Sequence, residues 1–449
     1  MPAPLPAAPR EKHYRDPIHN IITLDLSTEE DRVLSALIDT CEFQRLRRIR
    51  QLGMAHMAFQ GAEHSRFTHS IGVMHLARRL LERLRRHHFV EPRKALAVQC
   101  AALLHDLGHG PFSHVIEKFF TRHHEEWTRL AILDPDTEVH RVLASYDREF
   151  PADVAAALTN ELKPRWLCSL ISSQLDADRF DYLLRDSHMT GARYGVFDLE
   201  RLMLMLRVHE DQERVVVAAK GLLPLEKYLQ SRYQMYRQVY FHKTVTSAEA
   251  MLMAALRRAS DLAREGRLEE LPGRSPFRRV LAGQSDLAVA DYLALDDSVV
   301  LGALNDWSRG ADPVLRDLSN RLLNRRLFKA VEIADPENDM FMAGRMEHAR
   351  EIISRTGLDP RFYLLLSKSA DTPYKPYAGR GAKSAIWIED ERDPSVLREV
   401  QDVSPTIAAF TQRYDIHRAF FPATAGDAEL RSLLFATLSE APAAPPDAR

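Results

Sequence analysis

Apolar residues recur at helical spacing along most of the chain between residues 29 and 260. The stretch HSIGVMHLARRLLERLRRHH (69–88) shows this period well, because its arginines fall largely on other faces than its apolar positions Ile71, Met74, Leu81 and Leu84. One short segment near the N-terminus, HNIITLDL (19–26), alternates apolar and polar residues and predicts a strand. The pattern therefore predicts a mainly α-helical protein.

The C-terminal part of the chain has a different pattern of apolar and polar residues. A stretch that contains Gly and Pro at 266–277 predicts a loop, and the helical pattern then resumes through 306–331. Two strand-like stretches, RFYLLLSKS (361–369) and KSAIWIED (383–390), flank a segment rich in Pro, Gly and Tyr. We therefore predict a helical core with a smaller α+β lobe at its C-terminal end.

These features divide the chain into four parts. Both ends are rich in Pro and Ala and have little to bury, which predicts disordered tails. The predicted parts are a tail at 1–15, a helical core at 16–330, an α+β lobe at 331–437 and a second tail at 438–449.

Composition and charge narrow the classes of protein. With 45% hydrophobic residues, and 61 basic against 63 acidic side chains, the chain can bury a large core and carries no overall field that favours nucleic acid or a membrane. Cys41, Cys100 and Cys168 are too scattered for a disulfide framework, so we interpret them as buried thiols in a reducing compartment. Neither a signal peptide nor an apolar run of roughly 20 residues is found in the sequence, and we expect a cytoplasmic protein.

Candidate chemistry is concentrated in ALLHDLGHGPFSH (102–114), at the end of an apolar helical pattern. Because residues at i and i+4 share a helical face, His105, Asp106 and His109 can converge on one point. A set of imidazoles and carboxylates suits a divalent transition metal such as Zn, Mn, Fe or Ni. Two ligands alone bind weakly, and the best further candidates are His69 in EHSRFTHS and Asp178 in QLDADRFDYLLRD.

The order of these ligands, H…HD…D, resembles that of the HD superfamily of metal-dependent phosphohydrolases. More narrowly, six segments resemble the HD-domain deoxynucleoside triphosphate triphosphohydrolases (dNTPases), the branch that contains the mammalian SAM-and-HD-domain dNTPase and its bacterial relatives. These segments are FQRLRRIRQLG, EHSRFTHSIGV, HDLGHGPFSH, HEEWT, LDADRFDYLLRD and YFHKT. The resemblance extends from Asp16 to about residue 332, with the HD motif region at about 50–190.

The resemblance implies a mechanism. The catalytic metal would be held by His69, His105, Asp106 and Asp178, and Mg could accompany the nucleotide. Water activated by that metal would attack the α-phosphorus of a dNTP and release a deoxynucleoside and triphosphate. The residues implied in protonating the leaving 5′ oxygen are His109, His124 and Glu125. The neighbouring His123 and Glu117 leave a different His–carboxylate pairing open.

The resemblance also implies substrate contacts. The triphosphate would be held by Arg66, Arg179 and Arg232, with His114 nearby, since charged donors suit a polyanion. Gln51 and Asp186 match positions that bind the 3′-hydroxyl. Tyr182 matches a ring that leaves no room for a 2′-hydroxyl, and Tyr240 would lie by the base. Phe241 is apolar where guanine-reading relatives carry a polar side chain, which argues against strict base selectivity.

Members of this family often form tetramers and are activated by nucleotides at subunit interfaces. The positions here that match the effector region are Asp39, Gln44, Arg47, Arg325 and Lys329. We therefore expect a homo-oligomer, a dimer or tetramer, with a nucleotide effector, and neither a membrane nor a nucleic-acid partner.

Two rival functions stay open. The first is another HD-type phosphohydrolase, such as a nucleoside monophosphatase or a phosphodiesterase. The chain has LGHG where guanosine tetraphosphate hydrolases carry an acidic pair, and it has no GYP sequence of cyclic-dinucleotide phosphodiesterases. The second rival is a binder of nucleotides or single-stranded nucleic acid without catalysis, although the complete set of predicted metal ligands argues against it.

Overall fold

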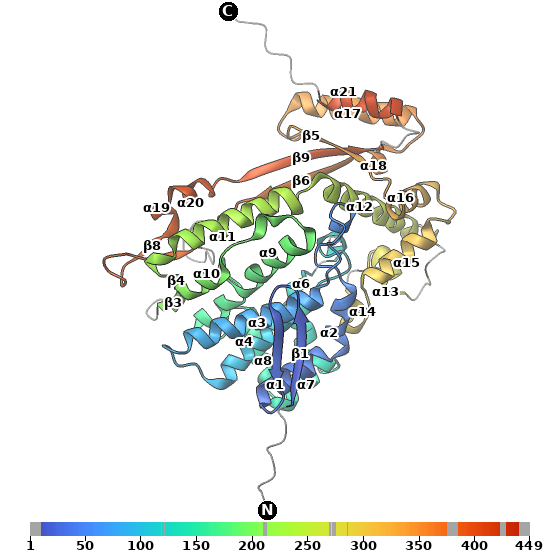
Figure 1. The fold of residues 1–449 in the computed structure, drawn as a ribbon. Helices are drawn as coiled ribbons and strands as arrows, with labels where there is room; N and C mark the ends of the chain where they lie inside the picture. Colours follow the sequence, from blue (N-terminus) through green and yellow to red (C-terminus); the bar gives the residue numbers. More distant parts are fainter. Residues whose placement is uncertain are drawn as a thin grey trace, which may run out of the picture.

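The computed structural model describes residues 10–117, 119–120, 122–209, 213–268, 271, 275–284, 286–374, 385–422 and 428–439, apart from the side chain of His114. The described chain is mainly helical, as the sequence predicts. Figure 1 shows one helical body, with a long strand and two helices, α17 and α21, at its upper edge. None of the described helices is both long enough and apolar enough to cross a membrane.

The first half of the chain forms the helical layer that carries the predicted site. It begins with a hairpin, in which β1 (Glu11–Asp16) pairs antiparallel with β2 (Asn20–Asp25). The helices that follow are α1 (Glu29–Ile38), α2 (Cys41–Arg45), α3 (Arg66–Leu84), α4 (Pro92–Leu104), α5 (His114–Glu117), α6 (His124–Leu133), α7 (Glu138–Tyr146), α8 (Phe150–Leu158), α9 (Ala177–Thr190), α10 (Leu199–Met205) and α11 (Leu222–Met235). Their apolar faces enclose one large core, in which α3 lies between α4 and α9.

The second half of the chain builds another core on the long helix α12 (Lys243–Arg264). A π-helical turn, Tyr236–Tyr240, precedes α12. The remaining helices are α13 (Pro276–Leu281), α14 (Val289–Leu293), α15 (Asp297–Trp307), α16 (Pro313–Leu323), α17 (Met340–Arg355), α18 (Pro360–Tyr363), α19 (Val400–Val403), α20 (Pro405–Ala409) and α21 (Ala428–Ser439).

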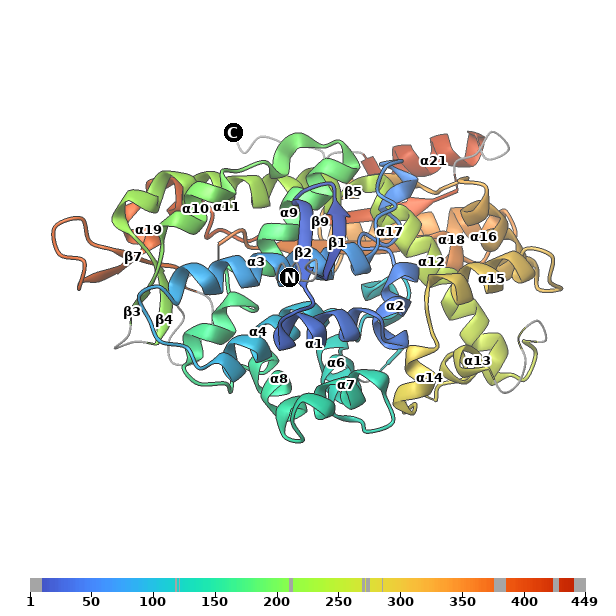
Figure 2. The same ribbon diagram turned by 60° about the horizontal axis from the view of Figure 1, so that its bottom comes forward.

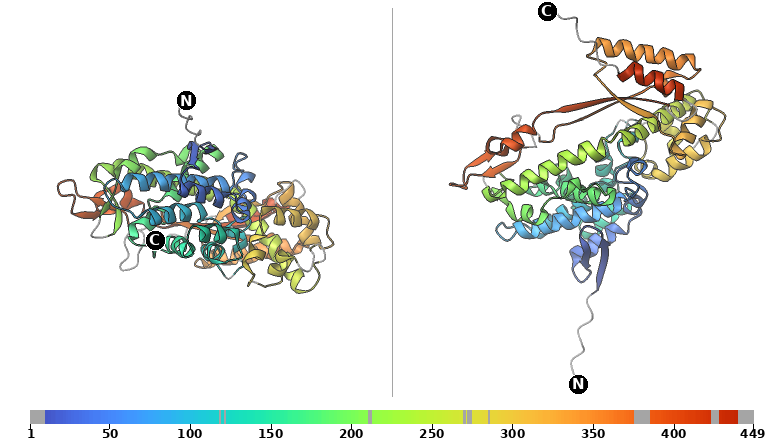
Figure 3. Two further views of the ribbon diagram at one scale, coloured as in Figure 1. Left: turned by 90° about the horizontal axis from the view of Figure 1, so that it is seen from below. Right: turned by 45° about the horizontal axis from the view of Figure 1, so that its top comes forward.

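Two further sheets join distant parts of the chain. In one, the order is β3 (Leu206–His209), β4 (Arg214–Val217), β7 (Trp387–Glu389) and β8 (Leu397–Glu399). In the other, the long β9 (Tyr414–Phe421) lies between β5 (Lys329–Ile333) and β6 (Leu365–Asp371), and it pairs antiparallel with both. Figure 3 shows this sheet under α17 and α21, at the end opposite the β1–β2 hairpin. The C-terminal lobe is therefore α+β, and its strands β7 and β8 extend a sheet of the core.

Local sequence sets the ends of the site-bearing helix α9. The carboxylate of Asp176 accepts a hydrogen bond from the backbone N–H of Arg179 at 2.8 Å and so caps the first turn. At the other end, Gly191 adopts φ = 74°, the left-handed conformation that ends many helices and costs glycine little. Asp178 therefore lies in the first turn of α9, and the start of this helix is fixed by Asp176, two residues earlier.

The N-terminal tail is predicted at 1–15, but residues 11–15 belong to β1, and residues 1–9 lie outside the described residues. The hydrophobic pattern misses this strand, since its side chains alternate between exposed and partly exposed positions without a buried apolar face. Backbone pairing with β2 holds it instead, together with an ion pair of 2.7 Å between Lys12 and Asp39.

Two other expectations about the elements are wrong. The pattern predicts helix through residue 331, but α16 ends at Leu323 and Arg325 takes φ = 54°, after which Lys329–Ile333 extend as β5. The boundary drawn at residue 330 therefore falls inside a strand. Cys41 is exposed, not buried, because it opens α2 at the surface, whereas Cys100 and Cys168 are buried as predicted.

Candidate metal centre and active site

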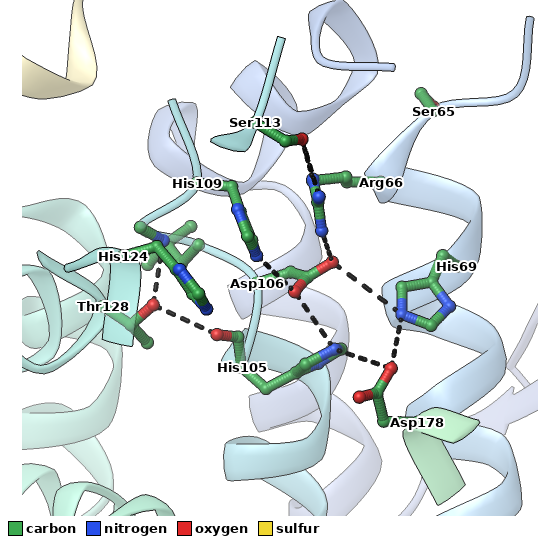
Figure 4. A network of polar contacts seen from close by, with 12 residues as sticks. Ser65, Arg66, His69, His105, Asp106, His109, Ser113, His124, Thr128 and Asp178 are labelled. Atoms are coloured by element: carbon green, nitrogen blue, oxygen red, sulfur yellow. Dashed lines mark hydrogen bonds and ion pairs between the residues drawn. The ribbon is translucent and has the colours of Figure 1, made fainter. Parts of the chain in front are cut away.

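The four predicted metal ligands meet at one point, although they come from three separate elements. His69 lies in the first turn of α3, His105 and Asp106 follow the end of α4, and Asp178 lies in α9. Figure 4 shows these side chains turned toward a common centre. Asp178 Oδ1 lies 3.1 Å from His69 Nε2 and 3.7 Å from His105 Nε2, and Asp106 Oδ1 lies 3.3 Å from His105 Nε2. Ligand atoms about 2.1 Å from one tetrahedral ion lie about 3.4 Å apart, so these spacings fit a metal.

Two buried nitrogen atoms support this fit. His69 Nε2 and His105 Nε2 are buried and make no hydrogen bond within the described part of the chain. The opposite ring nitrogens are occupied, because His69 Nδ1 donates to Asp181 Oδ2 at 2.8 Å and His105 Nδ1 donates to the carbonyl of Ala102 at 2.9 Å. Each Nε2 is thereby left with a lone pair that faces the carboxylates, which is the arrangement a divalent transition metal requires.

The electrostatics of the cluster keep its carboxylates ionised. Burial alone would raise the pKa of Asp106, but the charge of Arg66 and the neighbouring imidazoles hold it well below its usual range. Burial would likewise lower the pKa of His69, but the adjacent carboxylates of Asp178 and Asp181 outweigh it and raise that pKa to about 10. Without a cation between them, the two carboxylates of Asp106 and Asp178 thus draw protons onto the histidines, and a metal ion can take the place of those protons.

A strained loop places Ser113 against Arg66, which begins α3 and contacts Asp106. Arg66 Nη1 lies 2.5 Å from Asp106 Oδ2, and Arg66 Nη2 donates to Ser113 Oγ at 2.7 Å. Phe112 and Ser113 both have positive φ, 50° and 48°, which costs non-glycine residues of the order of 1–2 kcal/mol each. The carboxylate of Asp297 holds this loop by accepting the N–H of Phe112 at 2.8 Å.

Gly108 allows the HD segment to pack closely on α6. A Cβ atom at this position would lie 2.1 Å from the carbonyl oxygen of His124 and 2.3 Å from the backbone nitrogen of Thr128. The hydroxyl of Thr128 accepts the N–H of Gly108 at 2.9 Å and donates to the carbonyl of His105 at 3.1 Å. This contact brings His124, at the start of α6, beside the metal ligands.

A second cluster of titratable groups lies next to the first. The rings of His109 and His124 stack at a centroid distance of 3.8 Å, and His124 Nδ1 lies 2.7 Å from Glu117 Oε1. His109 Nε2 lies 3.3 Å from Asp106 Oδ1, which links the two clusters. Burial and the charge of Arg66 lower the pKa of His109 well below its usual value, so His109 is neutral near pH 7.

The sequence pairs His124 with Glu125 and leaves Glu117 as an alternative, and the structure brings Glu117 to His124. The carboxylate against His124 comes from Glu117 on α5, whereas Glu125 is exposed and has no ion pair in the described structure. His123 is the exposed residue before α6, so His124 is the histidine that faces the cavity.

A cavity of about 1360 Å³ opens over both clusters. Several predicted substrate residues line it, namely Gln51, Arg66, Tyr182, Asp186 and Tyr240. The carboxylate of Asp186 is held on both sides, because Oδ1 accepts from His64 Nε2 at 2.8 Å and Oδ2 from the Tyr240 hydroxyl at 2.8 Å. Gln51 Oε1 is buried without a hydrogen-bond partner among the described residues, so it is ready to receive a donor from a ligand.

Two of the predicted phosphate contacts, Arg179 and Arg232, do not line this cavity. Arg179 lies 3.4 Å from Asp176, at the start of its own helix. Arg232 is buried, contacts the carbonyl of Pro373 and lies 3.5 Å from Asp371 Oδ1. The side chain of His114 lies outside the described residues. Basic residues that do line the cavity are Arg66, Arg129, Arg257, Arg361 and Lys368.

The predicted effector residues form two groups on the surface. Asp39, Gln44 and Arg47 lie on α1 and α2 or directly after them, where Gln44 Oε1 accepts from Arg47 Nε at 2.8 Å. Arg325 donates to the carbonyl of Met57 at 2.8 Å, and Lys329 is exposed in β5. Within the described chain, the contacts of the first group and those of the second involve different residues.

Sequence reasoning missed two residues of this site, His64 and Asp181, and gave a third, Glu117, only as an open alternative. His64, Glu117 and Asp181 each contact a predicted functional side chain, at 2.7 to 2.8 Å. His64 and Asp181 stand inside the quoted segments EHSRFTHS and LDADRFDYLLRD, and Glu117 stands three residues after HDLGHGPFSH. Each of them is a polar residue within an otherwise apolar helical pattern, and this is the sequence feature that could have indicated a role in the site.

Comparison with known proteins agrees with the site. Residues 66–183 match the HD domain and residues 197–272 match the HD associated region. The chain is 39% identical over 415 residues to the uncharacterized protein YwfO of Bacillus subtilis, with 92% of each chain covered. It is 30% identical to the human deoxynucleoside triphosphate triphosphohydrolase SAMHD1 over 72% of this chain and 55% of SAMHD1, so the match spans little more than half of that relative.

Solved structures give the same result. The crystal structure of a phosphohydrolase from Bacteroides thetaiotaomicron superposes with a TM-score of 0.79 at 29% identity, covering 92% of this chain and 100% of that one. A hypothetical protein from Aquifex aeolicus superposes with a TM-score of 0.69 at 28% identity, covering 95% and 100%. The four converging ligands, the matched HD domain and these relatives together show that the chain belongs to the HD-domain family of phosphohydrolases.

Proposed function

We propose that this HD-domain phosphohydrolase is a dNTP triphosphohydrolase, which cleaves a dNTP to a deoxynucleoside and triphosphate. The observation that carries the proposal is one cavity that holds the metal-ligand cluster together with Gln51, Tyr182 and Asp186, the groups that match a deoxyribose site. The relatives named dNTP triphosphohydrolases agree with it.

Different residues of the site would carry out different parts of the reaction. A divalent metal, when held by His69, His105, Asp106 and Asp178, would polarise a phosphoryl oxygen and lower the pKa of water. Arg66 would neutralise phosphate charge beside Asp106, from a buried position where charged hydrogen bonds are strong. His124, with its ring against His109 and its Nδ1 against Glu117, would hold the proton that the leaving 5′ oxygen receives.

The sugar and base of the nucleotide would contact two polar side chains and two aromatic rings. Gln51 and Asp186 would bind the 3′-hydroxyl, and the Tyr182 ring, 6.2 Å from that of Tyr240, would lie along the sugar. Phe241 lines the same cavity with an apolar ring, so we propose that the base is not strictly selected.

The direct test is a product analysis. Protein loaded with Mn²⁺ is incubated with each dNTP and each matching rNTP, and the nucleoside, the monophosphate and tripolyphosphate are separated by chromatography. We expect deoxynucleoside and tripolyphosphate in equal amounts. Release of inorganic phosphate from a dNMP, with no turnover of any dNTP, would contradict the proposal.

Tyr182→Ala is expected to narrow the preference for dATP over ATP. A ring against C2′ excludes the extra hydroxyl by a clash and leaves it without a partner, at roughly 1 to 3 kcal/mol for the unmade hydrogen bond. That corresponds to about tenfold to a hundredfold in kcat/KM. Competition between dATP and ATP measures the ratio, and Tyr182→Phe, which keeps the ring, should retain the wild-type preference. If Tyr182→Ala keeps a large preference, Tyr182 does not select the sugar.

A nucleoside monophosphatase is the second candidate, and a specific observation favours it. Arg179 and Arg232 do not line the cavity, so of the three predicted triphosphate arginines only Arg66 does. A monophosphate needs fewer cations than a triphosphate. The same chromatogram separates the two reactions, because only the monophosphatase would release inorganic phosphate from a dNMP.

Regulation and assembly belong to the same proposal. We propose a nucleotide effector near Asp39, Gln44 and Arg47, and a homo-oligomer, either a dimer or a tetramer, in the cytoplasm. Support comes from the surface position of these three polar residues, which share one corner of the fold.

A further inference from the structure

The β1–β2 hairpin reaches the centre of the protein through two buried polar contacts with α9. In Figure 2 the hairpin lies in front of α3, at the face where α9 also packs on that helix. At its turn, His19 Nε2 donates to Asp181 Oδ1 at 2.7 Å, and Asp16 Oδ2 lies 2.8 Å from Arg185 Nη1. These four side chains are each 5% exposed or less.

The turn itself is organised to present His19. Asp16 Oδ1 accepts the backbone N–H groups of Ile18 and His19 at 2.8 and 2.9 Å, while its other oxygen contacts Arg185. Asn20 has φ = 64°, the left-handed conformation that asparagine tolerates in turns. The hairpin therefore docks as one unit, with Asp16 fixing the backbone from which the His19 side chain leaves.

Asp181 connects His19 to the predicted metal ligand His69. Its Oδ2 accepts from His69 Nδ1 at 2.8 Å, and Arg185 donates to Oδ2 from Nε at 2.7 Å and to Oδ1 from Nη2 at 2.9 Å. With His19 on Oδ1, four donors hold one carboxylate in a single orientation. Gly72 of α3 makes room for it, since a Cβ atom there would lie 2.0 Å from Asp181 Oδ1.

We propose that the β1–β2 hairpin is part of the metal site, because His19, acting through Asp181, holds the His69 ring in the orientation that turns Nε2 to the metal. His19 is thus a positioning residue, not a ligand. The inference rests on the proposed metal centre of His69, His105, Asp106 and Asp178. It goes beyond that centre by making metal affinity depend on an element that contributes no ligand.

Loss of His19 removes one of the four donors to Asp181 and leaves Oδ1 with Arg185 alone. The carboxylate can then rotate, and the His69 ring that it orients rotates with it. Residues that orient metal-ligating histidines typically contribute 10- to 100-fold to metal affinity, so we expect the Kd for a divalent metal to rise by about that factor.

The experiment measures Co²⁺ binding to the full chain after metal removal. Isothermal titration gives the Kd, and the visible absorption spectrum of the Co²⁺ complex reports ligand geometry. The variants are His19→Ala, His19→Gln, which places an amide N–H near the position of Nε2, and the control His13→Ala. His13 is exposed on β1 of the same hairpin, and it contacts Thr23 and Glu11 of that hairpin.

We expect His19→Ala to weaken Co²⁺ binding about 10- to 100-fold and to change the spectrum, while His19→Gln and His13→Ala stay close to wild type. Should His19→Ala fail to fold, His19→Phe, which keeps a buried ring but donates no hydrogen bond to Asp181, takes its place in the same assay, with the same expected loss. Wild-type Kd and spectrum in the variant would overturn the role of the hairpin. A wild-type protein that binds no Co²⁺ would instead overturn the metal centre itself, so the two failures are distinguishable.

Discussion

Asp106→Asn is expected to lower kcat/KM for the hydrolysed nucleotide by about 10³-fold or more and to abolish tight metal binding. Asp106 lies 3.3 Å from His105 Nε2 and 3.8 Å from His69 Nε2, so its carboxylate faces both imidazoles of the cluster and would supply negative charge to a metal held there. A catalytic metal supplies several kcal/mol of transition-state stabilisation, and each 1.4 kcal/mol is a factor of ten. Removing the charge that holds the metal removes that contribution.

The substitution to Asn separates chemistry from folding. An amide oxygen can still accept from Arg66, which is buried at 2.5 Å from Asp106 Oδ2, whereas Ala would leave that guanidinium without its partner at a cost of about 3–5 kcal/mol. Asp136→Asn, at an exposed site after α6, is the matched control. Metal content by mass spectrometry and steady-state kinetics measure the effect, and near-wild-type turnover in Asp106→Asn would exclude this cluster as the catalytic centre.

The helical layer was predictable because its signal is local. Ile71, Met74 and Leu81 of α3 are buried as their period predicts, and the residues that face other helices repeat with the same spacing. β1 was not predictable in this way, since its stability comes from pairing with β2 and from contacts to Asp39 and Arg185, which stand far along the chain. The β3–β4 hairpin was not predicted either, because each of its strands is four residues long, which is too short for an alternating pattern to stand out.

The metal ligands could be predicted because their residue types are unusual where they stand. A histidine or carboxylate on an apolar helical face costs free energy unless it has a partner, so each such residue marks a site. Which residue partners which is a different question, decided by the packing of separate helices. Asp181 and Asp178 stand three residues apart on α9, yet one orients His69 Nδ1 and the other faces His69 Nε2. No spacing rule distinguishes these two roles.

Glu117→Gln is expected to lower kcat about 10²-fold or more with a smaller change in KM. The carboxylate of Glu117 lies 2.7 Å from His124 Nδ1, so its charge favours the protonated imidazole that would donate to the leaving 5′ oxygen. General acid catalysis contributes typically 10²–10⁴-fold, and an amide at this position can orient the ring but cannot supply the charge. This variant therefore removes the negative charge beside His124 and keeps a hydrogen-bond partner that holds the ring in position.

Glu125→Gln and Glu126→Gln distinguish the two possible pairings. Glu125 is the partner that the sequence predicts, and it lines the cavity from an exposed position on α6. Glu126 stands beside it, 3.3 Å from Arg122, and serves as the control. If Glu117 is the partner of His124 during catalysis, Glu117→Gln loses far more activity than Glu125→Gln. If Glu125→Gln shows the larger loss, His124 turns to Glu125 in the substrate complex, and the contact with Glu117 belongs to the free enzyme alone.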